Sequence, residues 1–323
     1  MVMTALQKHP YVIIVMLAWL QGCAAPQANP TAANHVFASF DVDSQPGQYA
    51  PIIAPQQTSL EHNRIGRAMA LHNKEGKEEI YIATDQPTLY YREQDLVTAR
   101  GNHYHNLIYR LHFPYVPQPR LTAGKNGGLF VIISLNNQQQ PVLITTVHTC
   151  GCYLAIVPTS YLSTTAYPKE WDSDRQTVYG ESLPGRLDYP AQFSTEWRPV
   201  IYLRSGNHRV MNISLSRQGP LPDTQTVRLA PISSLDQLPL DRGQTSFFHQ
   251  SGSHKGYVKG ASKPWEQLLM SWWTFDLNIG HDKRLGDPAE TGTVFYTSLK
   301  PWARDASNMW FFADFLDYWG WRL

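Results

Sequence analysis

The sequence has few charged residues and no excess of either sign. Only 16% of its 323 residues are Asp, Glu, Lys or Arg, and without residues 1–22, which contain one lysine, it carries 26 basic and 26 acidic residues. A nucleic-acid partner requires a basic face, so this balance predicts no nucleic-acid partner. After residue 22, no apolar run approaches the ~20 residues that a membrane-spanning helix needs.

Cysteine is also scarce, with Cys23, Cys150 and Cys152 alone in the chain. A chain of this length can bury a full core without disulfide bonds. In an oxidising compartment a cysteine pair favours a disulfide, but alternate residues of a straight strand lie about 6.6 Å apart at Cα, at the edge of the permitted range. Gly151 could allow a turn that closes this gap. Cys150 and Cys152 therefore form either a strained, reducible disulfide or a pair with another role.

Complete catalytic motifs are missing as well. The sequence has no Ser-x-x-Lys, no His-Glu-x-x-His and no phosphate-binding loop. The segment 180–184 departs from the nucleophile elbow because Pro184 stands where that motif has glycine. Whether the protein is an enzyme therefore stays open.

The first 23 residues have the organisation of an export signal. An apolar core of about ten residues, too short to span a bilayer, precedes Leu20-Gln21-Gly22-Cys23. This segment resembles the lipobox of bacterial lipoprotein signal peptides. The resemblance implies removal of residues 1–22 and acylation of Cys23, which would anchor the chain to a membrane of the cell envelope. The residue after Cys23 is Ala24 and not Asp. Under the sorting rule of enteric lipoproteins, which this segment resembles, that residue favours the outer membrane. The protein would then face the periplasm.

The remaining sequence predicts a tether followed by one β-rich domain. Residues 23–60 are rich in Pro, Ala, Gln and Asn, which is typical of a flexible tether, and residues 61–323 form the globular part. Alternating or continuous apolar patterns predict strands at 80–82, 106–116, 128–135, 141–157, 198–203 and 209–215. The segments 128–157 and 198–215 are each typical of a hairpin, and 219–245 of an irregular connection. We expect a mainly β or α+β fold, with an antiparallel sandwich or barrel-like core and peripheral and C-terminal helices.

The aromatic-rich C-terminal part contains two predicted helices, over residues 264–273 and 307–319. Ser307 is the candidate N-cap of the second helix. Its apolar stripe, which predicts packing on the sheet, consists of Met309, Phe312, Ala313 and Leu316.

The segment His148-Thr149-Cys150-Gly151-Cys152 is the best candidate for a site. In a strand over 141–157, the period of two places His148, Cys150 and Cys152 on one face. Histidine and cysteine are the usual ligands of zinc and copper. Since residues 148 and 152 of a straight strand are about 13 Å apart, only two of the three could bind one metal. His112 or His105 from a neighbouring strand would complete the set.

Three functions remain open from the sequence. The first is an outer-membrane-anchored lipoprotein with a binding or structural role, whose partner is a small ligand or another envelope protein. The second is a periplasmic metalloprotein or metalloenzyme with zinc or copper at the His148, Cys150 and Cys152 segment. The third is a thiol–disulfide protein that uses Cys150 and Cys152.

Overall fold

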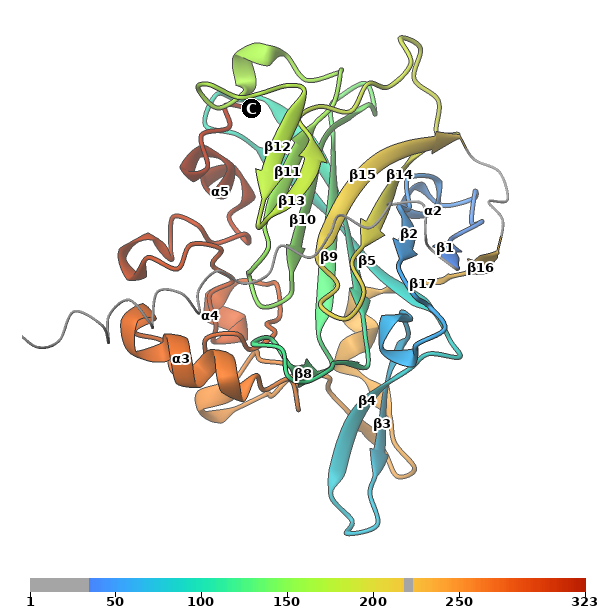
Figure 1. Cartoon of the computed structure of the whole chain (residues 1–323), viewed down its shortest axis with the longest axis vertical. Coiled ribbons are helices and arrows are strands. Elements are labelled where there is room, and N and C mark those ends of the chain that lie inside the picture. The colour runs from blue at the N-terminus through green and yellow to red at the C-terminus, as the bar shows by residue number, and fades with distance from the viewer. Residues whose placement is uncertain (1–34, 218–222) are drawn as a thin grey trace, which may run out of the picture.

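Two β-sheets packed face to face form the body of the protein (Figure 1). The computed structural model describes residues 35–217 and 223–323, so the predicted lipobox and Cys23 lie outside the described residues. Neither sheet in these two ranges closes into a barrel, and the predicted mainly β sandwich with C-terminal helices is confirmed.

The first sheet has the strand order β15-β14-β2-β1-β16. Its strands are β1 Val36–Ala38, β2 Ile52–Pro55, β14 Trp197–Leu203, β15 Val210–Arg217 and β16 Thr224–Thr226. β14 and β15 form the predicted antiparallel hairpin, whereas β14 pairs with β2 and β1 pairs with β16 in parallel.

The second sheet has the order β11-β10-β9-β6-β5-β17. Its strands are β5 Thr88–Val97, β6 His103–His112, β9 Gly128–Leu135, β10 Pro141–His148, β11 Ala155–Pro158 and β17 Arg228–Pro231. All pairs are antiparallel except β17 with β5. Every residue of β9 is buried, as its continuous apolar run predicts for a strand that is covered on both faces.

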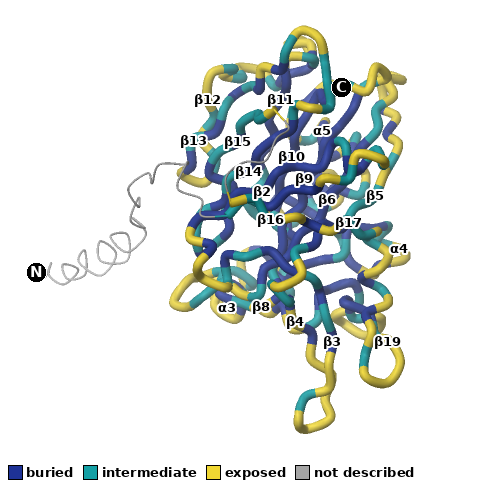
Figure 2. Tube along the Cα trace, turned by 90° about the vertical axis from the view of Figure 1, so that its right-hand side faces the viewer, coloured by how far each residue is buried: buried dark blue, intermediate teal, exposed yellow. Residues whose placement is uncertain are grey.

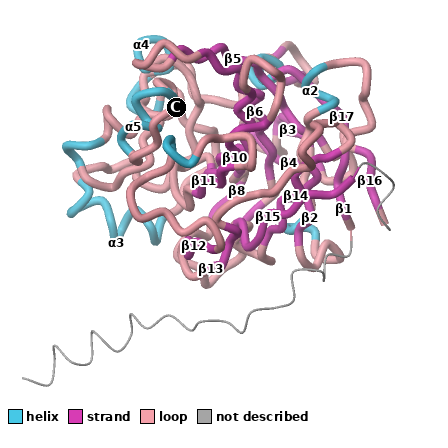
Figure 3. Tube along the Cα trace, turned by 90° about the horizontal axis from the view of Figure 1, so that it is seen from above, coloured by secondary structure: helices cyan, strands magenta, loops and turns pink. Residues whose placement is uncertain are grey.

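Shorter elements surround the two sheets. Four hairpins consist of β3 Arg67–His72 with β4 Glu78–Ala83, β7 Tyr115–Val116 with β8 Gly124–Lys125, β12 Arg175–Val178 with β13 Glu181–Pro184, and β18 Leu238–Pro239 with β19 Gln244–Thr245. The helices are α2 Gln45–Gln48, α3 Pro264–Thr274, α4 Pro288–Thr291 and α5 Phe312–Tyr318, with 3-10 turns η1 Glu61–Asn63, η2 Thr164–Ala166, η3 Ile232–Asp236, η4 Gly252–His254 and η5 Pro301–Ala303. Figure 2 shows the exposed tip of the β3–β4 hairpin, which projects from the body, and Figure 3 shows α3, α4 and α5 gathered on one side.

The second sheet has a hydrophobic core on each face. Leu107, Tyr109 and Leu111 of β6 point into the sandwich, as their alternation predicts. Ile108 faces the other way, into a core that includes Phe312 and Phe315 of α5. The C-terminal part is therefore a third layer on the outer face of this sheet.

The predicted tether does not extend to residue 60. β1 and β2 belong to the first sheet, and Phe37 and Ile53 are fully buried in the sandwich core. These strands have three and four residues, too few for a period-two pattern to stand out from the Pro-rich and Ala-rich sequence around them. The tether prediction for residues 36–55 is therefore wrong.

Two other boundaries differ from the sequence prediction. α5 begins at Phe312 rather than near Ser307, whose buried hydroxyl accepts hydrogen bonds from the amides of Thr297 and Ser298 instead of capping the helix. The described residues 223–245, predicted to be irregular, contain β16, β17, η3, β18 and β19. In both places tertiary contacts override what the local sequence predicts.

Candidate functional site

A tight turn follows β10, at the segment that the sequence singles out. The amide of His148 donates to the carbonyl of Cys152 over 2.9 Å, and the amide of Gly151 donates back to the carbonyl of His148 over 2.8 Å. Gly151 has a φ of 94°, and a Cβ atom placed there would lie 2.2 Å from the carbonyl oxygen of Tyr296. The predicted single strand over 141–157 is therefore wrong, because the chain turns at 149–153 and β11 starts only at Ala155.

Cys150 and Cys152 are joined by a disulfide across this turn, with their Cα atoms 5.6 Å apart. The turn, and not a shared strand face, brings the two sulfurs together. Cys150 is 3% exposed, whereas Cys152 is partly exposed. A disulfide that closes a loop of only three residues restricts the unfolded chain little, by about 1.6 kcal/mol in the chain-entropy model, compared with about 3 kcal/mol for a 15-residue loop.

Buried charges lie beneath the turn. Lys263 Nζ is 3.2 Å from Asp282 Oδ2, and the hydroxyl of Thr149 donates to the other oxygen of this carboxylate. Lys283 Nζ donates to the carbonyl of Cys150 over 3.0 Å and lies 3.8 Å from the ring centroid of Tyr296. Burial lowers the pKa of Lys283 to about 8, which leaves its ammonium form predominant at neutral pH. The backbone carbonyl of Cys150 therefore accepts a hydrogen bond from a buried ammonium group.

Glu266, in the first turn of α3, approaches the other sulfur. Its Oε1 atom is 3.7 Å from Cys152 Sγ, and the side chain is 4% exposed. A disulfide sulfur carries no proton, so this is a van der Waals contact in the oxidised state. Oε2 has no hydrogen-bond partner among the residues that the structure describes. Burial raises the pKa of the Glu266 carboxyl, although nearby Lys263 opposes the shift.

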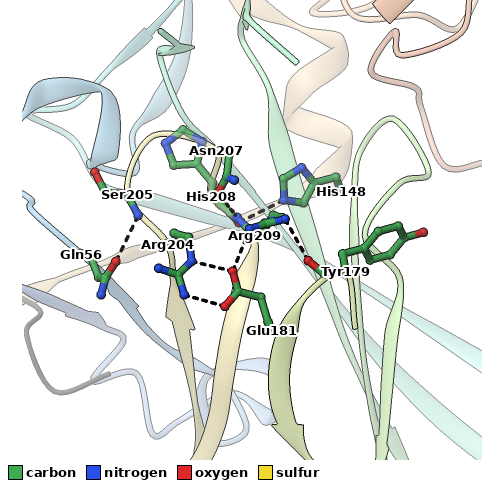
Figure 4. Close-up of polar contacts among 9 residues, drawn as sticks. All are labelled: Gln56, His148, Tyr179, Glu181, Arg204, Ser205, Asn207, His208 and Arg209. Atoms are coloured by element: carbon green, nitrogen blue, oxygen red, sulfur yellow. Dashed lines mark hydrogen bonds and ion pairs between the residues drawn. The ribbon is translucent and has the colours of Figure 1, made fainter. Parts of the chain in front are cut away.

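His148 faces the interior of the sandwich, where it contacts the first sheet (Figure 4). Its Nε2 donates to the carbonyl of His208 over 3.0 Å, and the His208 ring stacks on Phe113 with centroids 3.8 Å apart. Burial lowers the pKa of His148 to about 4 and that of His208 well below its usual range. Both imidazoles are therefore neutral at pH 7. His148 links β10 to the β14–β15 connection, and the His208 ring contacts the carbonyl of His62 in η1 over 2.8 Å.

An ion-pair cluster lies beside these histidines (Figure 4). Glu181 of β13 is 3% exposed and accepts two hydrogen bonds from Arg204, over 2.5 and 2.6 Å, and one from Arg209 over 2.9 Å. Bidentate contacts of this kind are among the stronger polar interactions in proteins. Glu181 therefore fixes the β14–β15 connection against the β12–β13 hairpin.

The structure does not bring the predicted metal ligands together. His148 is opposite Leu129 and so faces the sandwich, whereas His112 is one residue beyond Leu111 on β6 and faces the opposite side. There His112 accepts a hydrogen bond from Arg110 over 2.9 Å. The two cysteines are bonded to each other, and no group of three or more His, Cys, Asp or Glu side chains in residues 35–217 and 223–323 is placed to hold a metal ion.

His105 is also separated from this segment. It pairs with Leu135, six residues along β9 from the partner of His148, or about 20 Å at strand spacing. Its ring nitrogens contact Asp95 over 2.8 Å and Glu93 over 3.1 Å. The prediction of a site that joins His105 or His112 to His148, Cys150 and Cys152 is wrong.

A cleft of about 290 Å³ lies next to the disulfide turn, and its lining begins two residues after Cys152. Its lining residues are Leu154, Ala155, Ile156, Trp171, Gln176, Thr177, Val178, Tyr179, Trp319 and Trp321. The indole N–H groups of Trp171 and Trp319 donate to Gly185 and Thr297 within the protein. These two side chains therefore offer ring surfaces rather than hydrogen-bond donors, which suits the flat face of a small ligand.

The helix α3 has its polar side inward and its apolar side outward. Glu266, its one charged residue, and Thr274 are buried. Four of its large apolar side chains are at least half exposed: Trp265 at 50%, Leu268 at 67%, Leu269 at 56% and Trp272 at 74%. Soluble helices normally have the opposite arrangement.

The exposed apolar surface continues beyond α3. Phe275 is 78% and Leu277 is 83% exposed, and Trp302 of η5 is 83% exposed. Arg304, two residues after Trp302, donates to the carbonyls of Thr274 and Phe275 at the end of α3, so η5 lies close to this end of the helix. We call the surface formed by α3, Phe275, Leu277 and Trp302 the aromatic face.

Comparison of the chain with protein-family models, with curated proteins and with solved structures finds no match. Any assignment of function therefore depends on the residues themselves. Sequence reasoning found Cys150, Cys152 and His148 but missed Glu266, Asp282 and Lys283. The available signal was weak: Asp282 and Lys283 stand in a polar segment without periodicity, and only tertiary contacts place them under the turn.

Proposed function

We propose that this protein is an envelope lipoprotein, anchored through acylated Cys23, that binds the membrane surface through its aromatic face. The observation that carries the proposal is the inverted polarity of α3, which buries Glu266 and exposes Trp265, Leu268 and Trp272. Large contiguous apolar surfaces on soluble proteins mark contacts with proteins or membranes. The function is therefore binding at the envelope surface, as the lipobox resemblance also implies.

The composition of the aromatic face favours lipid over a protein partner. Trp265, Trp272, Trp273 and Trp302 supply four indoles within 38 residues of sequence. Tryptophan is enriched at membrane–water interfaces, where its ring lies among the headgroups and its N–H remains close to water. No exposed carboxylate on α3 opposes insertion, since its one acidic residue is buried. The helix has 11 residues, and no helix in the described part of the chain is long and apolar enough to cross a bilayer.

The acyl anchor and the aromatic face would act together in this arrangement. The 12 steps of chain between the Cα atoms of Cys23 and His35 can span at most about 43 Å when fully extended. An acylated Cys23 would therefore hold the body within a short distance of the bilayer. At such a distance even modest affinity of the aromatic face is sufficient, because the second contact becomes intramolecular.

Flotation with lipid vesicles tests the proposal. A Cys23→Ser form produced without the apolar leader, residues 1–22, isolates the aromatic face from the acyl anchor. Its binding to phosphatidylethanolamine–phosphatidylglycerol vesicles is compared with that of the same form carrying Leu268→Gln and Trp272→Gln. Exposed apolar side chains contribute about 1.5–3 kcal/mol each when fully buried, so the double substitution is expected to weaken binding at least tenfold. The matched control, Val97→Gln with Tyr115→Gln, alters two exposed apolar residues elsewhere and should leave binding unchanged.

Two results would contradict the proposal. If the Cys23→Ser form does not bind vesicles, the aromatic face is not a lipid-binding surface. The same follows if the control pair Val97→Gln and Tyr115→Gln loses as much vesicle binding as Leu268→Gln with Trp272→Gln. Mass spectrometry of the N-terminal peptide tests acylation separately, and an unmodified Cys23 in the full chain would remove the anchor from the proposal.

A further inference from the structure

We propose that Cys150 and Cys152 form an exchangeable disulfide that reacts with thiols, with Cys152 as the sulfur that is attacked and Cys150 as the sulfur that leaves. The substrate class is a thiol, either a small molecule or a cysteine of another envelope protein. This activity is independent of membrane binding.

The two sulfurs differ in access. Cys152 is partly exposed, while Cys150 is 3% exposed and lies at the buried side of the turn. A thiolate from solution can therefore approach Cys152 but not Cys150. Access of this kind decides which sulfur of a disulfide is attacked.

The surroundings of each sulfur match these roles. Lys283 Nζ donates to the backbone carbonyl of Cys150 over 3.0 Å, so the ammonium group lies on the same residue as the leaving sulfur. A cation in the neighbourhood of a cysteine favours its thiolate. The carboxyl group of Glu266 lies 3.7 Å from Cys152 Sγ, close enough to exchange a proton with that sulfur once it is reduced. Cys150 thus has an ammonium group on its backbone carbonyl, and the Cys152 sulfur has a carboxyl group that can donate or accept a proton.

The turn does not depend on the disulfide for its shape. The two backbone hydrogen bonds between His148 and its partners Gly151 and Cys152 close it, and the amide of Lys283 donates to the carbonyl of Thr149 over 2.7 Å. Reduction therefore leaves the two thiols adjacent and able to re-form the bond. The disulfide also contributes little entropic stabilisation, because it closes only three residues.

The reaction balances with two thiols as reductant. The two substrate thiols first lose their protons to solvent. The first thiolate attacks Cys152 Sγ, the S–S bond breaks, and Cys150 leaves as a thiolate; the two released protons return to Cys150 and, after the second step, to Glu266. A second thiolate attacks the substrate sulfur of the mixed disulfide, and Cys152 leaves, taking a proton from the Glu266 carboxyl group. The substrate thiols become a disulfide, and the protein disulfide becomes a dithiol. The reverse sequence reduces a substrate disulfide to two thiols and re-forms the protein disulfide, with Glu266 accepting the proton of the Cys152 thiol.

Trapping of the mixed disulfide tests the assignment of the two sulfurs. In the full chain, Cys150→Ser leaves Cys152 without its partner, and incubation with oxidised glutathione should produce a glutathione adduct on the peptide that contains Cys152. The matched variant Cys152→Ser keeps only the buried Cys150 of this pair, and we expect no glutathione adduct on the peptide that contains Cys150. Peptide mapping by mass spectrometry separates both from Cys23. Equal labelling of the two variants, or none in a folded Cys150→Ser protein, would overturn the proposal.

A second measurement uses the unsubstituted cysteines and so does not depend on how these variants fold. The native protein is incubated with dithiothreitol and alkylated at intervals, which gives the rate of disulfide reduction. This rate is compared with the rate of global unfolding under the same conditions. We expect reduction to be faster than unfolding, and Glu266→Gln to slow reoxidation by glutathione disulfide at least about tenfold. A disulfide that is reduced only as fast as the protein unfolds would show that it is inert in the native state.

Discussion

Glu266 Oε1 lies 3.7 Å from Cys152 Sγ, so the first turn of α3 rests directly on the disulfide turn. The same helix carries the outward apolar side chains of the aromatic face. One buried carboxyl group therefore contacts the candidate reactive sulfur and anchors the candidate membrane-binding helix.

The buried carboxyl group of Glu266 predicts an unusual pH dependence of stability. Burial raises its pKa above the ordinary value of 4.5, so the folded state holds this proton more tightly than the unfolded state. Its contribution to stability is then complete below pH 4.5 and is lost as the pH rises through the folded-state pKa. Glu266→Gln removes this titration, and we expect the variant to gain stability relative to the wild type as the pH rises from 4.5 to 8.

Urea denaturation at a series of pH values measures this difference. Glu75→Gln, at a side chain that is 71% exposed, is the control for the loss of one carboxylate. A stability difference between Glu266→Gln and wild type that stays constant from pH 4.5 to 8 would contradict the expectation.

Gly151 should tolerate no side chain. Its φ of 94° costs an alanine about 1–2 kcal/mol, and the added Cβ would lie 2.2 Å from the backbone oxygen of Tyr296. We expect Gly151→Ala to lower the free energy of unfolding by at least about 3 kcal/mol. Gly101 has a φ of 78° with no atom within 4 Å of the Cβ position, so Gly101→Ala measures the backbone cost alone. Equal losses in urea denaturation of the two variants would show that the contact with Tyr296 is not limiting.

The sequence predicted strands correctly where each face of the strand has the same burial along its whole length. The alternation of Leu107, Tyr109 and Leu111 predicts β6, and the continuous apolar run predicts the doubly covered β9. The prediction failed at the disulfide turn, because the period-two pattern that starts at Val142 continues through Cys152 and conceals the reversal at Gly151. A positive φ has no signal beyond the glycine itself.

The candidate site illustrates a second limit. An amphipathic pattern shows that a helix has an apolar and a polar face. That the apolar face packs on the core is an assumption taken from most soluble helices. In α3 this assumption is wrong, because Glu266 is buried beside Cys152 and Lys263 while Trp272 is exposed. Buried polar clusters such as Lys263 with Asp282 depend on residues distant in sequence and cannot be predicted from local pattern.

The ion-pair cluster around Glu181 should contribute strongly to stability. Its carboxylate is 3% exposed and neutralises Arg204 and Arg209 together. Glu181→Gln leaves two partly buried guanidinium groups without a counter-charge, and we expect a loss of about 2–3 kcal/mol in the free energy of unfolding. The matched control is Glu196→Gln, which breaks an exposed pair with Arg217 and should cost less than about 1 kcal/mol. Similar losses for both variants in urea denaturation would mean that burial does not strengthen the Glu181 cluster.

The link between the sheets through His148 predicts acid sensitivity. Burial lowers the pKa of His148 to about 4, from an ordinary value of 6.5. Above pH 6.5 the ring is neutral in both folded and unfolded states, so this histidine adds no pH dependence there. Between pH 6.5 and 4 the unfolded state takes up a proton that the folded state does not. Stability is therefore lost as the pH falls, by up to about 1.4 kcal/mol per pH unit for this one group.

His148→Gln separates this titration from that of the other groups. Glutamine does not titrate, and its amide can still donate to the carbonyl of His208, which His148 contacts over 3.0 Å. We expect urea denaturation to show a smaller slope of stability against pH between 6.5 and 4 in the variant than in the wild type. His103→Gln, at an exposed histidine on β6, controls for the loss of an imidazole from the surface. If His148→Gln and wild type keep the same slope across this range, the proton taken up on acid unfolding belongs to another group, and His208, whose pKa burial also lowers, becomes the next residue to substitute.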